Sequence, residues 1–151
     1  MFSAAAAHAT GSPVLDAQAD FRRARRRHTV ARVGRLLARR PPGKRPRTLA
    51  TATATIGGRR RMEVVALNSI IGTLEPSPLF DDRFRPASEV VRHRWERVAL
   101  AHRRGEALPP VVLHARPEGY YVVDGRHRVS VAASLGLGDI DGWVTGTRRQ
   151  T

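Results

Sequence analysis

The 151-residue sequence contains no cysteine. Disulfides, thiolate-ligated zinc and thiol chemistry are therefore excluded together. Aromatic residues make up only 5% of the chain, which argues against a surface on which nucleic-acid bases stack. The 6 histidines show no metal-ligand spacing, so we expect no metal site. No apolar run approaches the roughly 20 residues that a membrane-spanning helix needs, and we expect no membrane partner.

Acidic residues are scarce in the first part of the chain. Residues 1–61 hold 15 Lys and Arg against 2 Asp and Glu, a net charge of +13, whereas the remainder holds 12 against 11. This asymmetry is typical of a basic arm attached to a folded domain, and nucleic acid is the first partner to expect. We expect contact with DNA phosphates that is independent of sequence, through Arg22, Arg23, Arg25, Arg26, Arg27, Arg32, Arg35, Arg39 and Arg40. The alternative is a solvated basic helix with no dedicated partner.

Composition divides the chain into four parts. Residues 1–17 are rich in Ala, Ser and Gly and are expected to be disordered. Residues 18–40 predict a basic helix that ends at Pro41-Pro42, and residues 41–61 read as a Pro/Gly and Thr-Ala linker. Residues 62–151 predict a compact domain. Because the arm offers few apolar residues, we expect this domain to fold without it.

The folded part alternates strand-like and helix-like segments. A strand is expected within residues 62–70, an extended loop over 72–88, and a helix over 89–104 whose first turn is capped by Ser88. Two strands (111–115 and 120–124), a helix that stops at Gly136, and a last strand (140–145) follow. This order predicts an α+β fold with a small mixed sheet, preceded by a basic arm that is partly helical or disordered.

The turn Asp124-Gly125-Arg126-His127-Arg128 lies between the second of those strands and the last helix. The first turn of a helix has free backbone N–H groups and the positive end of the helix dipole, and glycine lets a ligand approach the backbone. With the two arginines these features predict a phosphate-binding loop. Alternatively, Asp124 caps the helix and the arginines are solvated or paired with Asp139 or Asp141. The residues alone leave both interpretations open.

The segment "LPPVVLHARPEGYYVVDGRHRVSVAASLGLGDIDGWV" resembles the core of the ParB/sulfiredoxin superfamily, and the resemblance extends over residues 62–145. It implies that Gly125, Arg126, His127 and Arg128 take the places of the motif that grips CTP phosphates in ParB chromosome-partition proteins. The loop that contains Arg83 and Arg85 resembles the segment that completes that pocket. The cofactor implied is CTP or another nucleoside triphosphate, with Mg²⁺.

Departures from the superfamily pattern narrow the expectation. Sulfiredoxins have a nucleophilic cysteine where this chain has Arg126, so sulfiredoxin activity is excluded. The second nucleotide motif of ParB proteins and their helix-turn-helix module have no counterpart here. We therefore expect sequence-specific DNA reading, where it occurs, to come from a separate protein partner.

The resemblance and the charge pattern together predict a nucleotide-phosphate-binding, DNA-associated domain in the cytoplasm, associated with the nucleoid and without assigned catalytic residues. The alternative is a small enzyme of the same fold, a nuclease or a nucleotide-dependent phosphotransferase. It would use Asp124 and an acidic loop of Glu75, Asp81 and Asp82, whose carboxylates could hold Mg²⁺. A third interpretation is a helix start that is merely capped.

Overall fold

The computed structural model describes residues 9–39, 47–48 and 58–147. It contains three α-helices and two short 3₁₀ segments: α1 (Pro13–Leu37), η3 (Leu67–Ser69), η4 (Glu89–Val91), α2 (Arg92–Arg103) and α3 (Arg126–Ser134). The strands are β1 (Arg47–Thr48), β2 (Arg61–Ala66), β3 (Ile70–Thr73), β4 (Val111–Arg116), β5 (Gly119–Asp124) and β6 (Asp139–Gly146). None of the helices in the described part of the chain is long and apolar enough to cross a membrane.

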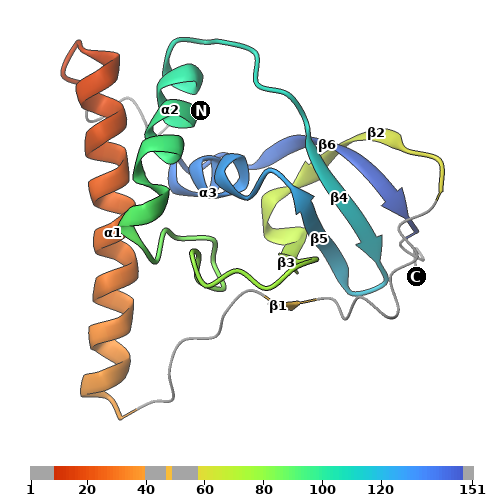
Figure 1. Cartoon of the computed structure of the whole chain (residues 1–151), viewed down its shortest axis with the longest axis horizontal. Coiled ribbons are helices and arrows are strands. Elements are labelled where there is room, and N and C mark those ends of the chain that lie inside the picture. Colours follow the sequence, from red (N-terminus) through yellow and green to blue (C-terminus); the bar gives the residue numbers. More distant parts are fainter. Residues whose placement is uncertain (1–8, 40–46, 49–57, 148–151) are drawn as a thin grey trace.

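The strands form one mixed sheet in the order β1-β3-β5-β4-β6-β2. Strands β4 and β5 form an antiparallel hairpin, β6 runs parallel to β4, and β2 closes the far edge antiparallel to β6. On the other side of the hairpin, β3 pairs parallel to β5. The three helices gather at one side of this sheet, and α3 lies closest to it (Figure 1). The expected α+β fold class is confirmed.

Most of the elements expected in residues 62–145 are present. Ser88 accepts a hydrogen bond from the N–H of Val90 at 3.2 Å, as a capping residue does, and η4 and α2 together cover the expected helix. The difference lies in residues 62–70, where the expected single strand is interrupted by η3 and resumes as β3. The break separates two partners, because β2 pairs with β6 while β3 pairs with β5 on the opposite half of the sheet.

Helix α1 is part of the hydrophobic core, contrary to the expectation that the arm stays outside it. Ala17, Phe21 and Ala24 are buried and pack in one cluster with Trp95 and Val131. Phe21 lies against the Trp95 ring in an edge-to-face arrangement, with ring centroids 5.5 Å apart. The apolar stripe of the arm is narrow, but it is concentrated in one half of the helix. A domain that begins at residue 62 would therefore lack part of its own core.

Two acidic residues on the same face of α1 are buried with those side chains. Asp20 accepts hydrogen bonds from Arg103 Nε at 2.6 Å and Nη2 at 2.8 Å, and it also pairs with Arg23. The hydrogen bond to Asp20 raises the pKa of Arg103. Hydrogen bonds from the backbone and side chain of Thr10 lower the pKa of Asp16. The two acids of the arm thus hold α1 against α2 by polar contacts.

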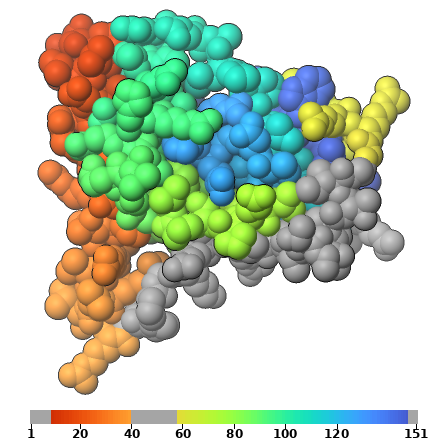
Figure 2. Space-filling model, viewed as in Figure 1, coloured from red at the N-terminus to blue at the C-terminus, as the bar shows by residue number. Residues whose placement is uncertain are grey.

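The boundaries of the arm also differ from those expected. Residues 13–17, expected to be disordered, form the first turn of α1, which begins with Pro13 at a helix start where its missing N–H costs nothing. The expected linker overlaps two strands, because Arg47 and Thr48 pair with β3 and Arg61 opens β2. The remainder of the expected disordered segment and linker lies mostly outside the described residues. The C-terminal half of α1 extends beyond α2 (Figure 1; Figure 2).

We predict that Phe21→Ala lowers the free energy of unfolding by about 3–5 kcal/mol, the usual cost of removing a fully buried phenylalanine ring. Val33→Ala, on the same helix but 45% exposed, is the matched control and should change stability by less than about 0.5 kcal/mol. Urea denaturation of the full chain measures both. Equal small effects for the two variants would mean that α1 does not contribute to the core.

Candidate functional site

The turn between β5 and α3 depends on a glycine. Gly125 has φ +105°, a conformation that side-chain-bearing residues rarely adopt. A Cβ at this position would lie 2.7 Å from a methyl carbon of Val111. Glycine is therefore required by the fold, because it turns the chain sharply from the end of the strand into the first helical turn. Gly125→Val would strain this turn whether or not a ligand binds there.

The first turn of α3 has no side-chain cap. Gly125 occupies the N-cap position and has no side chain to offer, and Asp124 directs its carboxylate to Arg128 at 3.2 Å instead. The interpretation that Asp124 caps the helix is therefore wrong. Within the described residues, the N–H groups of Arg126, His127 and Arg128 have no acceptor. These donors and the helix dipole make the start of α3 electropositive.

A small pocket of about 130 Å³ opens at this helix start. It is lined by the turn itself and by two residues of α2, Arg94 and Val98. Arg94 and Arg126 bring two guanidinium groups to the pocket, and neither forms an ion pair with any residue of the described part. The carboxylate of Asp124 is the pocket's acidic group, and it is engaged by Arg128. The pocket therefore has a surplus of positive charge.

His127 shows the effect of that charge. Burial, together with the nearby charges of Arg94 and Arg126, lowers the pKa of His127 to about 4. Its ring stands edge-to-face against Phe80, with centroids 5.3 Å apart. At neutral pH the imidazole is uncharged, so it offers one N–H donor and one acceptor to the site.

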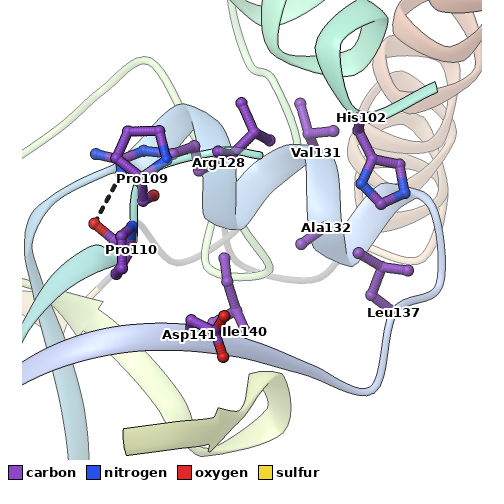
Figure 3. Close-up of a pocket in the computed structure, with 10 residues that line it drawn as sticks. His102, Pro109, Pro110, Arg128, Val131, Ala132, Leu137, Ile140 and Asp141 are labelled. Atoms are coloured by element: carbon purple, nitrogen blue, oxygen red, sulfur yellow. Dashed lines mark hydrogen bonds between the residues drawn. The ribbon is translucent and has the colours of Figure 1, made fainter. Parts of the chain in front are cut away.

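Arg128 has a structural role that the sequence did not reveal. Its Nη1 donates to the carbonyl oxygens of Pro109 and Pro110, the latter at 2.8 Å (Figure 3). The side chain is only 15% exposed and ties α3 to the segment that leads into β4. The alternative that the arginines of this turn are solvated therefore does not hold for Arg128. The predicted partners Asp139 and Asp141 do not pair with it; Asp141 lines a neighbouring cavity of about 160 Å³ together with Val131.

The loop over 72–88 reaches the site with different residues from those expected. Neither Arg83 nor Arg85 lines the pocket at the start of α3. Arg83 is exposed, whereas Arg85 donates from Nε to Asp81 Oδ2 at 2.7 Å. The loop instead contributes Phe80, which contacts His127. Arg94, which does line the pocket, was not singled out by the sequence; its only signal is that it precedes Trp95 on the polar side of a helix.

The acidic loop does not form a cation site. Asp81 is buried. Its Oδ1 accepts hydrogen bonds from the backbone N–H groups of Arg83 and Arg85. Its Oδ2 contacts the ring of His28 and accepts a hydrogen bond from the Arg85 side chain. Burial raises the pKa of Asp81, but the hydrogen bonds from His28 and Arg85 outweigh it, and the net shift is downward. In the described ranges no three His, Asp or Glu side chains converge as metal ligands would. Asp81 is committed to joining α1 to this loop.

The arginines expected to contact DNA fall into two groups. Arg25 and Arg27 attach α1 to the rest of the fold, because Arg25 donates to the carbonyl of Pro86 at 3.2 Å and Arg27 to that of Ser134 at 3.2 Å. Arg23 pairs with Asp20 within α1. The others of the described part point to solvent or are half-buried and have no ion-pair partner in that part: Arg22, Arg26, Arg32, Arg35 and Arg39. Arg40 lies outside the described residues.

We predict that Arg128→Ala lowers the free energy of unfolding by about 1–3 kcal/mol, because it leaves two carbonyl groups without their charged donor. Arg126→Ala, two residues away and without an ion-pair partner in the described part, serves as the control and should change stability by less than about 0.5 kcal/mol. Chemical denaturation of the two variants without added anions tests this. A fully stable Arg128→Ala variant would show that the contacts with Pro109 and Pro110 contribute nothing.

Comparison with known proteins gives one structural likeness to report. No family model matches the chain, and no curated protein matches it. Among solved structures, the crystal structure of sulfiredoxin from Arabidopsis thaliana is similar to this chain with a TM-score of 0.42 and 19% sequence identity, covering 59% of this chain and 89% of that chain. The resemblance to the ParB/sulfiredoxin superfamily therefore stays a prediction from the residues.

Proposed function

We propose that this protein binds the phosphate group of a nucleotide at the start of α3. The observation that supports this most directly is the combination of an uncapped helix start with Arg94 and Arg126, two guanidinium groups that lack acidic partners in the described part of the chain. A phosphate placed there would accept hydrogen bonds from free backbone amides and from both side chains. Such charge-assisted bonds are about twice as strong as neutral ones.

The arrangement suits an anion for a second reason. Arg94 and Arg126 carry like charges at the same pocket, and both, after burial, contribute to the low pKa of His127. A bound phosphate would offset the repulsion between Arg94 and Arg126 and would interact with the dipole of α3. Binding therefore relieves an electrostatic cost that the folded protein otherwise bears.

In this proposal the protein is a binding module, with a nucleoside triphosphate such as CTP, with or without Mg²⁺, as the candidate ligand. The enzyme alternative is supported less well by the geometry. Both oxygens of Asp81 are occupied by hydrogen bonds, and Asp124 Oδ2 is paired with Arg128. In the described part of the chain, Glu75, Asp81 and Asp82 do not converge as the ligands of a metal ion would.

A second contact, with DNA, is favoured by the surface of α1. Arg22 and Arg26 are exposed and lie one turn apart, about 100° and about 140° around the helix axis from Phe21. No acidic residue occurs between Phe21 and Glu63 in the sequence. We propose that α1 adds sequence-independent affinity for DNA phosphates, which would place the protein on the nucleoid in the cytoplasm.

The first test is pyrophosphate binding. In the full chain, Arg126→Ala should weaken it by about tenfold or more, the loss expected for a charge-assisted hydrogen bond. Arg83→Ala, which removes the same charge from an exposed position outside the pocket, should leave affinity within about twofold. Isothermal titration calorimetry measures both. Absence of pyrophosphate and triphosphate binding by the wild-type protein would refute the proposed function.

The pKa of His127 provides an independent readout. Bound phosphate places negative charge beside the imidazole and offsets Arg94 and Arg126, so the charged form becomes less unfavourable and the pKa should rise from about 4. An NMR titration of the ring carbon shifts, with and without saturating pyrophosphate, tests this directly. An unchanged pKa at saturation would place the anion elsewhere on the protein.

The contact of α1 with DNA has its own signature. For duplex DNA, log K should fall linearly with log salt, and Arg22→Ala/Arg26→Ala should make the slope shallower by about 1.8, because each lost phosphate contact removes about 0.9. Arg59→Ala/Arg60→Ala removes the same charge from exposed residues just before β2 and should leave the slope unchanged. The same slope change in both variants would indicate a diffuse effect of net charge.

A further inference from the structure

A second, larger basic cavity lies along α2. Its volume is about 740 Å³, and the polar residues that line it are His93, Arg94, Arg97, Arg104 and Glu106. Arg94, Arg97 and Arg104 follow the i, i+3, i+10 spacing of one helix face and extend over about 15 Å. Apolar side chains of α2 and of the following loop, among them Val98, Ala101 and Leu108, also line the cavity.

Whether an arginine of α2 has an ion-pair partner depends on the face of the helix on which it lies. Those toward α1 are paired: Arg92 contacts Glu89 and Glu96 at 3.4 Å, and Arg103 is held by Asp20. On the cavity face, Arg94 and Arg97 have no ion-pair partner in the part of the chain that the structure describes.

At the end of that row, Arg104 has only a weak ion pair. Its partner is Glu106 at 4.0 Å, and both side chains are about half exposed, so the pair contributes little. Acidic residues thus pair with the arginines on the side of α2 toward α1, and the cavity side of α2 stays positively charged.

The cavity along α2 adjoins the pocket at the start of α3. Arg94 and Val98 line both of them. The pocket has backbone N–H groups without a cap, and the cavity along α2 has both basic and apolar side chains in its lining. A mononucleotide phosphate accounts for the pocket but leaves the row of Arg97 and Arg104 unused.

We propose that this composite site binds a single strand of nucleic acid that carries a terminal phosphate. The terminal phosphate would lie at the start of α3, where Arg94 and Arg126 meet the free amides. The following phosphates would run along Arg97 and Arg104, with bases against Val98 and Leu108. The proposal rests on the proposed function of the pocket and extends it by naming the ligand to which the phosphate belongs.

The geometry favours a strand over the other polyanions. In a duplex the phosphates lie on the convex surface of a stiff double helix, so they cannot enter a pocket of about 130 Å³ while the neighbouring bases stay paired. An acidic peptide would satisfy the arginines, but a carboxylate has only two oxygens for the amides and guanidinium groups at the helix start. A terminal phosphate has three unesterified oxygens and more charge.

The test uses the full chain and fluorescence anisotropy with a 12-nucleotide single strand that has either a 5′-phosphate, a 3′-phosphate or only hydroxyl ends. We expect at least one phosphorylated strand to bind about tenfold tighter than the hydroxyl strand. Arg126→Ala should abolish this difference. Arg97→Ala should weaken all three strands by about three- to tenfold and leave pyrophosphate binding within about twofold. Arg83→Ala is the matched control for loss of one charge.

Several outcomes would overturn the inference. They are equal binding of phosphorylated and hydroxyl strands, an Arg97→Ala variant that binds like Arg83→Ala, and competition by polyglutamate as effective as that by an unlabelled strand. Duplex binding that depends on Arg97 to the same extent would also do so. Failure of pyrophosphate to bind is separate, because it refutes the proposed phosphate pocket itself. If pyrophosphate binds but any of the four outcomes above is observed, only the proposed nucleic-acid strand is refuted and the phosphate pocket is not.

Discussion

The burial of Trp95 is the constraint on which the arrangement of the molecule depends. Its side chain is fully buried, and the indole N–H donates to Ser130 Oγ at 2.8 Å, a bond between α2 and α3 in a region without solvent. The ring also packs against Phe21 of α1. One side chain therefore joins all three helices. A buried indole that lost this acceptor would leave its N–H unsatisfied, so the packing admits little rotation of α2 relative to α3.

This constraint determines where the basic side chains lie. Arg94 immediately precedes Trp95, and helical geometry directs it about 100° away from the core, toward the start of α3. There it meets Arg126, one residue beyond the glycine that turns the chain. Burial of an apolar residue thus creates a positively charged pocket without requiring any attraction between the two arginines. Their repulsion is tolerated because packing, and not electrostatics, sets the position of α2.

Local patterns predicted much of residues 62–145. Two apolar segments separated by a short connection indicated the β4–β5 hairpin, and Ser88 marked the start of the helical segment that precedes β4. The parallel pairing of β3 with β5 was not predictable in this way, since it joins segments about fifty residues apart with no signal in either. Helix α1 was assigned to an arm because its apolar stripe is thin. Its attachment depends on ion pairs such as that between Asp20 and Arg103, which lie far apart in the sequence.

The position of the candidate site was predictable from the sequence, but the role of each of its residues was not. The glycine between a strand and a helix, followed by two arginines, indicated the turn correctly. Which arginine faces the pocket depends on tertiary contacts: Arg128 reaches the carbonyls of Pro109 and Pro110, while Arg126 remains available. Arg85 was assigned to the pocket through the superfamily resemblance of its loop, yet it forms an ion pair with Asp81. Arginine is long enough to reach several partners, so spacing alone cannot assign one.

Charge balance explains why so many arginines remain without partners. The chain has 27 Lys and Arg but only 13 Asp and Glu, and several of those acids are committed to buried or interhelical contacts. Because Asp16 and Asp20 are the acidic residues nearest to the arm's arginines in the sequence and both face α2, the outer surface of α1 cannot be neutralised from within its own segment. The fold therefore determines where the surplus positive charge lies. Acidic residues lie on the helix faces that pack against one another, and arginines without acidic partners lie on the faces that do not pack. The fold brings several of these arginines together in the pocket at the start of α3 and in the cavity along α2, so positive charge is concentrated at these two concave places, and the anionic ligand is proposed for this reason.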